Sequence, residues 1–476
     1  MISRQLFPNS KGNALIGVFQ RSLLYNSSTL SSQLRPQSFQ KVQCLHTRPL
    51  NQAKEARLHA DIDVKETKEA PHFMKMYTTG ELWRYTLLSF VTAQPWLLKL
   101  AIKVLPYTPV FLVRFFVCPV YTGGENFSQV RETGVKLLNR GITNMMLSYA
   151  VEDADGKLDK AELKASVEMI KQSVNEVLVK EYELAESRFE NGQMLTSPAS
   201  GYVALKPTGI MENSADILAN FDNPAYAEQY AKYLDVCRDI CAHAKEHGKG
   251  KVVIMFDAEK LWLQKGVYDA QRRMMKEFNS NSQVIVAGTL QMYLKHSVDL
   301  LKYEIEEAKK GKYQLAMKLV RGAYTHSEPT RDRDIHACKK DTDDSYNEGT
   351  AIMLESLASS WKSGDRNGPV SRLIVASHNA ESCDIVAKKV RSMAPAGLDL
   401  STNEDVVYGQ LLGMSDDQSL ELTRRGLKVV KYVPWGPAKA TKEYLTRRLE
   451  ENGDAARGGW DHFFRGCKEL MARTVS

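Results

Sequence analysis

Polar side chains that could do chemistry stand where short apolar runs of the chain end. The residues at or near these ends are Lys206, Asp257, Ala258, Glu259, Gln291, Tyr293, Lys318, Arg321, Gly322, Ala323, Tyr324, Ser377, His378, Asn379 and Tyr432, and the helix expected after the last run holds Arg447 and Arg448. Cations in this set suit an anionic ligand, such as a carboxylate, a phosphate or the pyrophosphate of a cofactor. A single Lys or Arg in such a place is more often a solvated rim residue, and a lone His is more often a core residue. Their recurrence at most of the run ends favours one shared site.

The runs that carry these residues predict eight buried strands. They are 143–149, 202–205, 252–256, 284–287, 315–320, 373–376, 406–412 and 427–433. Each is rich in β-branched residues or Leu and has few charges, as is typical of parallel strands that are covered on both faces. Amphipathic segments lie between them, most clearly 223–248, which begins after Asn223-Pro224 and stops at Gly248. Eight strand–helix units predict an α/β fold, a TIM-like (βα)₈ barrel with its active site at the carboxyl ends of the strands.

Several other kinds of site find no support in the sequence. The chain has no G-x-G-x-x-G and no P-loop, so a Rossmann-type nucleotide site is not expected. It has no H-x-H or H-E-x-x-H pattern, and no metal is expected. Residues 151–162 resemble a calcium-binding EF-hand loop, but Val151 stands where the first Asp ligand should be. An acidic surface loop is the better interpretation of this segment.

The net charge of +7 comes from the N-terminal segment alone. Seven basic residues precede the first acidic residue, Glu55, and the remainder of the chain is balanced. This distribution shows no basic patch with interleaved aromatic residues, so a nucleic-acid partner is not expected. An acid-free stretch rich in Arg and Ser is typical of a mitochondrial transit peptide, which we assign to residues 1–55; a disordered basic tail is the alternative.

Residues 56–124 predict a helical arm in front of the barrel domain, 125–476. Within the arm, 85–120 is apolar and aromatic but is interrupted by Lys99, Lys103 and Arg114 and by Pro95, Pro106 and Pro109. No uncharged stretch is long enough for an ordinary transmembrane helix. Short apolar helices with lysines along one side suit the membrane interface, and an arm packed on the main domain is the equal alternative.

Taken together, the strand ends resemble those of the proline dehydrogenase (proline oxidase) family, in its mitochondrial, monofunctional form. The matching segments are YVALKPTG at 202–209, MFDAE at 255–259, KLVRGAY at 318–324, ASHNA at 376–380, GQLLGM at 409–414 and YLTRRLEENG at 444–453. The resemblance implies a distorted (βα)₈ barrel that holds FAD without a Rossmann fold. It implies oxidation of L-proline to Δ1-pyrroline-5-carboxylate, with electrons passed to ubiquinone, at the matrix side of the mitochondrial inner membrane. FAD rather than FMN rests on the resemblance alone.

The resemblance also implies roles for individual residues. Arg447, Arg448 and Lys206 would clamp the proline carboxylate, and Tyr432 and Leu411 would form walls around its ring. Asp257 resembles the acid of the catalytic pocket, and Lys318 falls where the family has a cation near flavin N5. The expected flavin contacts are Ala258, Gln291, Lys318, Arg321, Gly322, Ala323, Ser377 and His378.

Two positions depart from the bacterial pattern, and two other readings stay open. Lys318 stands where bacterial forms usually have Arg, and Ser377 stands where they have Thr. The Lys ammonium is a single point charge, whereas an Arg guanidinium can donate two parallel hydrogen bonds. A lyase or aldolase on the same barrel would use Lys206 or Lys318 as a Schiff-base nucleophile. A membrane-surface scaffold would use 85–120 as its anchor and have no turnover. The oligomeric state is not predicted.

Overall fold

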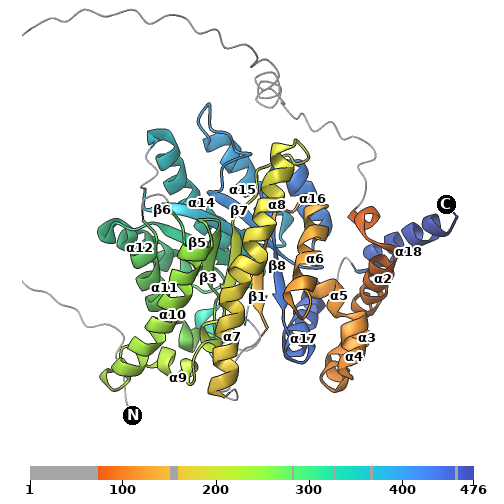
Figure 1. The fold of residues 1–476 in the computed structure, drawn as a ribbon, viewed down its shortest axis with the longest axis horizontal. Coiled ribbons are helices and arrows are strands. Elements are labelled where there is room, and N and C mark those ends of the chain that lie inside the picture. The colour runs from red at the N-terminus through yellow and green to blue at the C-terminus, as the bar shows by residue number, and fades with distance from the viewer. Residues whose placement is uncertain are drawn as a thin grey trace, which may run out of the picture. The chain divides into compact units, whose positions relative to one another are not determined.

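The fold is that of a closed parallel β-barrel surrounded by helices, with a group of helices beside it (Figure 1). The computed structural model describes residues 73–150, 159–280, 283–322, 324, 328–364, 368–455 and 459–475. All of these belong to one compact unit that begins at Glu66. The predicted (βα)₈ barrel with a helical N-terminal arm is confirmed.

The eight strands follow one another around the barrel in sequence order. They are β1 (Asn144–Tyr149), β2 (Gly201–Leu205), β3 (Val252–Phe256), β4 (Val286–Gln291), β5 (Leu315–Val320), β6 (Val370–Ala376), β7 (Val406–Leu411) and β8 (Val429–Trp435). β8 pairs in parallel with β1, with Tyr432 opposite Met146, and this pairing closes the barrel. Every predicted run overlaps one of these strands, because an uncharged β-branched segment between two helices has both faces covered.

One predicted strand is displaced along the chain. The sequence places the fourth strand at 284–287, whereas β4 begins at Val286 and continues to Gln291. The side chain of Asn279 accounts for the shift: its Oδ1 accepts from the amides of Ile285 and Val286, and its Nδ2 donates to the carbonyl of Val286. The amides at the start of the run are therefore bonded to a side chain, while the carbonyl of Ile285 still accepts from the amide of Ile254 in β3.

Helices lie before β1, between successive strands and after β8, and most of them cover the outside of the barrel. In chain order they are α6 (Phe127–Leu138), α7 (Lys160–Ser173), the π-helical turn η3 (Val174–Leu178), α8 (Val179–Glu190), η4 (Pro207–Gly209), α9 (Ser214–Ala219), η5 (Pro224–Tyr226), α10 (Ala227–His247), α11 (Leu261–Phe278), α12 (Ser297–Gly311), α13 (Arg331–Asp334), α14 (Lys339–Ser363), α15 (Ala380–Met393), α16 (Asp416–Arg424) and α17 (Ala438–Ala455). The predicted helix at 223–248 is η5 followed by α10. Asp159 and Glu162 form a capping box at the start of α7, and the remainder of the acidic loop lies outside the described residues.

The arm consists of short helices joined by prolines. They are η1 (Phe73–Met76), α2 (Thr79–Ala93), α3 (Pro95–Val104), η2 (Leu105–Tyr107), α4 (Val110–Phe116) and α5 (Cys118–Tyr121). The last helix of the chain, α18 (Gly459–Val475), packs along α2, where Gly466 allows close approach to Thr86 (Figure 1). Among the described residues no single helix is long and apolar enough to cross a membrane, although α2 with α3 and η2 passes that test as a pair bent by 107°.

Two apolar layers follow from the alternation of side chains along each strand. The inner layer fills the barrel with residues such as Met146, Met255 and Val430. The outer layer lies between strands and helices and holds most of the core. A separate cluster joins the arm to α16 and α17, with Leu82 and Val113 from the arm and Leu445 from α17.

A buried carboxyl lies between two outer helices, away from the barrel interior. Glu181 of α8 is 5% exposed and packs on Gly134 of α6, where an added Cβ would stand 2.5 Å from the carboxyl carbon. Burial raises the pKa of Glu181 to about 7, against the lowering effect of Arg131 and Arg188. Its charged form is therefore disfavoured in the fold.

Candidate active site

Asp257 is the centre of a group of polar side chains at the carboxyl end of the barrel. It follows β3, and its amide continues the strand pairing by donating to the carbonyl of Leu205. Lys318 on β5 donates to Asp257 Oδ1 at 2.5 Å, and the hydroxyl of Tyr432 on β8 donates to Oδ2 at 2.8 Å. The Lys318 and Asp257 side chains are only 6% and 13% exposed. Three residues that the sequence predicted for one site, from three strands, are thus in direct contact.

Tyr432 serves as a neutral donor in this group. Burial, followed by the neighbouring Asp257, raises the pKa of Tyr432 well above its ordinary value. The Lys318 ammonium lies 5.6 Å from the centroid of the Tyr432 ring, within range of a cation–π contact. The phenol therefore keeps its proton and can hold the Asp257 carboxylate in a fixed orientation.

Strand alternation places two more predicted residues on the interior side. Lys206 is two residues beyond the inward-facing Ala204, and Leu411 is four residues beyond the inward-facing Val407. The Leu411 amide donates to Nε2 of His378 at 3.1 Å. That nitrogen is therefore an acceptor, and in a neutral imidazole the proton sits on Nδ1. His378 and Leu411 lie side by side, as a shared cofactor and substrate site requires.

Arg321 and Ser377 form a second contact within the predicted set. Arg321 Nη2 donates to Ser377 Oγ at 3.0 Å, and the guanidinium lies 3.9 Å from the centroid of the Tyr346 ring. Asp343 of α14 accepts a hydrogen bond from Arg321 Nη1. Asp343 and Tyr346 were not predicted from the sequence, because they lie on one face of a helix rather than at a strand end.

Two buried polar atoms near these residues lack partners within the described part of the chain. They are Nε of Arg321 and Oε1 of Gln291. Gln291 is fully buried, and its amide nitrogen donates to the carbonyl of Glu259 and to the hydroxyl of Tyr293, at 3.0 and 2.8 Å. A buried donor or acceptor without a partner is costly, so both atoms suit a polar ligand at this end of the barrel. This observation fits the predicted flavin.

The segment after β5 is shaped for close approach of a ligand. Gly322 has φ of +84°, a conformation that other residues rarely adopt, and a Cβ added there would meet nothing within 4 Å. Tyr324 also has a positive φ, at +61°. Ala323, which lies between them, is outside the described residues. Ala258 directly follows Asp257 and is half-buried.

Arg447 and Arg448 lie in α17, one turn after Tyr444. Their side chains are outside the described part of the chain, so their proposed contact with a carboxylate stays a prediction. Neighbouring residues fix the helix: Leu445 and Leu449 are buried in the cluster shared with the arm, and Tyr432 packs against the same cluster. The backbone of α17 therefore passes next to the Tyr432 side of the site.

Comparisons with known proteins agree with this geometry. A sequence model of the family described as proline dehydrogenase matches residues 130–458. The carbapenem antibiotics biosynthesis protein CarD of Pectobacterium carotovorum is 28% identical over 358 residues, which cover 75% of this chain and 84% of CarD. Human proline dehydrogenase 1, mitochondrial, is 33% identical over 221 residues, which cover 45% of this chain and 35% of the human protein.

A solved structure shows the same fold. It is that of proline utilization A from Bdellovibrio bacteriovorus, inactivated by N-propargylglycine, with a TM-score of 0.58 and 18% identity. The match covers 85% of this chain and 41% of that protein. The chain spans less than half the length of the mitochondrial proline dehydrogenases that it matches.

Proposed function

The chain belongs to the proline dehydrogenase family, and from this premise we propose that it oxidises L-proline to Δ1-pyrroline-5-carboxylate with FAD and passes the electrons to ubiquinone. In this reaction the C5–H bond of proline gives up a hydride, the amine loses a proton, and a C=N bond forms. When bound, FAD would accept the hydride. The observation that carries the proposal is the buried cluster of Asp257, Lys318 and Tyr432 at the carboxyl end of the barrel.

The residues around this cluster fit the two ligands. Gln291 and Arg321 offer unpaired buried atoms to the cofactor, with Ala258, Gly322, Ala323, Ser377 and His378 as the other proposed contacts. Lys318 places a positive charge where negative charge would arrive, which stabilises the reduced ring electrostatically. Lys206, Arg447 and Arg448 would hold the carboxylate, and a rigid anchor at that end orients the other end of a small ring.

The environment of Lys318 argues against a lysine nucleophile at this position. A Schiff-base lysine must present a neutral amine. Lys318 instead forms an ion pair with the Asp257 carboxylate at 2.5 Å, so its nitrogen is already engaged as a hydrogen-bond donor. The flavin-dependent reaction uses that charge, whereas the lyase reaction would have to remove it.

An absorption spectrum before and after anaerobic proline tests the proposal. The purified protein should show flavin bands, and proline should bleach them. A colourless protein, or flavin bands that excess proline leaves unchanged, would refute the proposed reaction. A quinone analogue added afterwards should restore the bands if the electrons leave by that route, and failure to do so would refute the quinone part alone.

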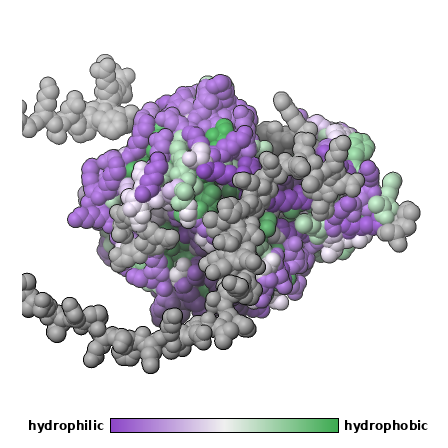
Figure 2. All heavy atoms as spheres, turned by 90° about the horizontal axis from the view of Figure 1, so that it is seen from above, coloured by the Kyte–Doolittle hydropathy of each residue, from purple (hydrophilic) through white to green (hydrophobic). Residues whose placement is uncertain are grey.

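We further propose peripheral attachment to a membrane through the arm. Trp96, Leu100, Val104 and Tyr107 recur on one side of α3 and η2 and are 48–87% exposed. The arm and α18 form the right-hand end of Figure 2, where green apolar side chains reach the surface. Between Glu81 and Glu125 the chain has four basic residues and no acidic residue. An apolar helix with cations beside it suits the surface of an anionic membrane, and a lipid-soluble quinone would be within reach there.

We also propose that residues 1–55 direct the protein to the mitochondrial matrix, with 56–124 as the arm and 125–476 as the catalytic domain. The support is the acid-free, Arg- and Ser-rich composition of the first segment. Changing Arg4, Arg21 and Arg35 to Glu should leave the protein outside mitochondria, as followed by fractionation and by its length on a gel. Normal import of this variant would refute the assignment.

A further inference from the structure

Lys431 is a fully buried cation on the outward face of β8, next to the site residue Tyr432. Its ammonium donates to the carbonyls of Leu411 and Met414 at 3.4 and 2.7 Å and pairs with Asp416 Oδ1 at 2.7 Å. One side chain therefore fastens the beginning, the middle and the end of the loop that joins β7 to α16. Burying an ammonium is unfavourable unless its donors are satisfied, and here the partners among the described residues lie in this loop and at its two ends.

The loop that Lys431 holds has little freedom of its own. Gly413 has φ of +73°, and a Cβ at this position would stand 2.4 Å from the carbonyl oxygen of Val120 in the arm. Ser415 has φ of +51°, which a residue with a Cβ adopts only under constraint. The loop begins at Leu411, which contacts His378 through its amide. Its position thus decides where the Leu411 side chain stands.

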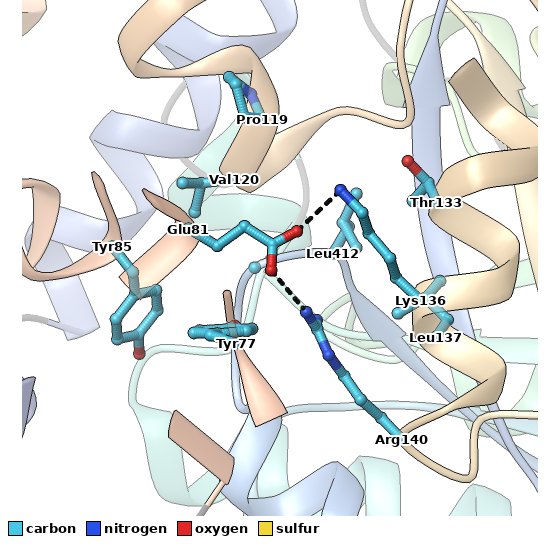
Figure 3. Close-up of a pocket in the computed structure, with 11 residues that line it drawn as sticks. Tyr77, Glu81, Tyr85, Pro119, Val120, Thr133, Lys136, Leu137, Arg140 and Leu412 are labelled. Atoms are coloured by element: carbon cyan, nitrogen blue, oxygen red, sulfur yellow. Dashed lines mark hydrogen bonds and ion pairs between the residues drawn. The ribbon is translucent and has the colours of Figure 1, made fainter. Parts of the chain in front are cut away.

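The arm reaches the same loop through Tyr77, whose hydroxyl donates to Asp416 Oδ2. The Arg140 guanidinium lies 4.3 Å from the centroid of the Tyr77 ring, and Glu81 of the arm bridges Arg140 and Lys136 of α6 (Figure 3). One oxygen of the Asp416 carboxylate therefore accepts a hydrogen bond from Tyr77 of the arm, and the other pairs with Lys431 of the barrel. Burial alone would raise the pKa of Asp416, but Lys431 and Tyr77 outweigh it, and the pKa lies below its ordinary value.

We propose that Lys431, Asp416 and Tyr77 are positioning residues that set the Leu411 wall of the substrate pocket, so that the arm is a working part of the active site. The inference rests on the proposed function, in which Leu411 lies against the proline ring. The chain of contacts runs from the Tyr77 hydroxyl to the Asp416 carboxylate, from there to the Lys431 ammonium, and from the ammonium to the Leu411 carbonyl. Through this chain of contacts the arm would affect how the proline ring fits against Leu411, and not how the substrate carboxylate is bound.

Tyr77→Phe tests the proposal with the smallest change. It removes the hydroxyl that bonds to Asp416 and leaves the ring beneath Arg140 in place. Tyr85→Phe is the matched control, because Tyr85 is also buried and its ring lies 5.5 Å from that of Tyr77, in the same aromatic cluster. Tyr77→Phe should lose more thermal stability than Tyr85→Phe, because it removes a hydrogen bond to a charged group. Lys431→Met is the stronger test, provided that circular dichroism and flavin content show that it folds.

The deciding measurement is the ratio of kcat/KM for proline to that for trans-4-hydroxyproline, whose ring carries one more substituent. A wall that has moved should change how the two rings are distinguished, whereas general loss of stability should lower both values together. Tyr77→Phe should raise the KM for proline and change the ratio by about 3- to 10-fold. This is less than the full effect of losing a hydrogen bond to a charged group, because only part of that free energy is expected to affect the position of Leu411. The kcat for proline should stay within about twofold, since Lys318 and Asp257 are untouched.

The outcomes separate this inference from the proposed function. If the wild-type protein does not oxidise proline, the proposed function fails first. If it does, and Tyr77→Phe leaves both the KM and the ratio at wild-type values, the proposal is overturned while the function stands. Equal changes in Tyr77→Phe and Tyr85→Phe would also overturn it, because the effect would then come from the cluster and not from the contact with Asp416. Should Lys431→Met fail to fold, Tyr77→Phe alone decides.

Discussion

Replacing Lys318 with Met removes the cation of the candidate site while keeping most of its volume. In the structure this ammonium is 2.5 Å from Asp257 Oδ1, and both side chains are nearly buried. The change leaves the Asp257 carboxylate with the Tyr432 hydroxyl as its remaining partner in the cluster. Two separate consequences follow, one for stability and one for catalysis.

The stability effect comes from a buried charge that has lost its counterion. Removing one partner of a buried ion pair costs about 3–5 kcal/mol, and because Tyr432 still donates to Asp257 we expect the lower end. For a protein of this size that lowers Tm by about 3–6 °C. The catalytic effect comes from the donor lost at the flavin. A charge-assisted hydrogen bond is worth roughly 1.5–3 kcal/mol, which predicts flavin reduction about 10- to 100-fold slower.

The double variant Lys318→Met, Asp257→Asn separates the two effects. It removes both charges, so most of the lost stability should return, whereas flavin reduction should stay slow. The assay is anaerobic stopped-flow reduction by proline, with flavin content and thermal unfolding measured on the same samples. Reduction by Lys318→Met within twofold of the wild type would refute the role of this lysine. Recovery of the rate together with stability in the double variant would show that the slow rate came from misfolding.

Three further predictions concern the carboxylate clamp, a buried acid and the arm. Changing Arg447 or Arg448 to Met should weaken proline binding by about 30- to 1000-fold, since leaving a desolvated carboxylate without its partner costs roughly 2–5 kcal/mol. Binding of pyrrolidine, which lacks the carboxylate, should weaken little. Equal losses of affinity for both compounds would contradict the clamp. Because the folded pKa of Glu181, about 7, exceeds the unfolded value of about 4.3, the folded state binds more protons between these pH values and its stability falls as pH rises through them. The free energy of unfolding of Glu181→Gln should therefore exceed that of the wild type by about 1–3 kcal/mol at pH 8 and nearly equal it at pH 4.3. Urea unfolding that shows the same difference at both pH values would contradict this prediction. The protein should sediment with anionic liposomes. Changing the exposed Trp96 and Leu100 to Glu should abolish sedimentation without lowering proline oxidation in solution. If the wild-type protein stays in the supernatant, the membrane proposal fails and the arm serves only to pack on the main domain.

The sequence predicted the barrel and the residues at the strand ends because both depend on local patterns. Asp257, Lys318 and Tyr432 stand at or near the ends of buried runs, and the carboxyl ends of all eight strands meet at one end of such a barrel. The boundaries of β4 could not be predicted, since the side chain of Asn279 takes the amides of Ile285 and Val286, a contact that no local pattern indicates.

Contacts between distant parts of the chain were beyond this kind of reasoning. Tyr77 and Asp416 are 339 residues apart, and neither belongs to a local pattern that points to the other. Lys431 lies inside a predicted buried strand, where a cation signals only that some partner must exist. Likewise, α18 is amphipathic, but nothing local indicates that its partner is α2, near the other end of the chain. The period of a pattern gives the face of an element, not the element that covers it.

The arm cannot be regarded as an anchor that is separate from the catalytic domain, because it holds the helix that carries the proposed clamp. α17 contributes Leu445 and Leu449 to the cluster built around Leu82, Leu98 and Val113 of the arm. Lys442 of α17 donates to the carbonyls of Pro106 and Thr108, at 3.2 and 2.5 Å, which ties the helix to η2 and the residue after it. Arg447 and Arg448 follow within two turns on the same helix. A helix that presents two arginines to a small substrate must have a fixed rotation about its axis and a fixed position along it. The packing contacts and hydrogen bonds with the arm fix both. If lipid contacts displaced α3 or η2, the displacement would reach α17 directly, so the proposed membrane attachment and the proposed substrate clamp would share one set of packing contacts.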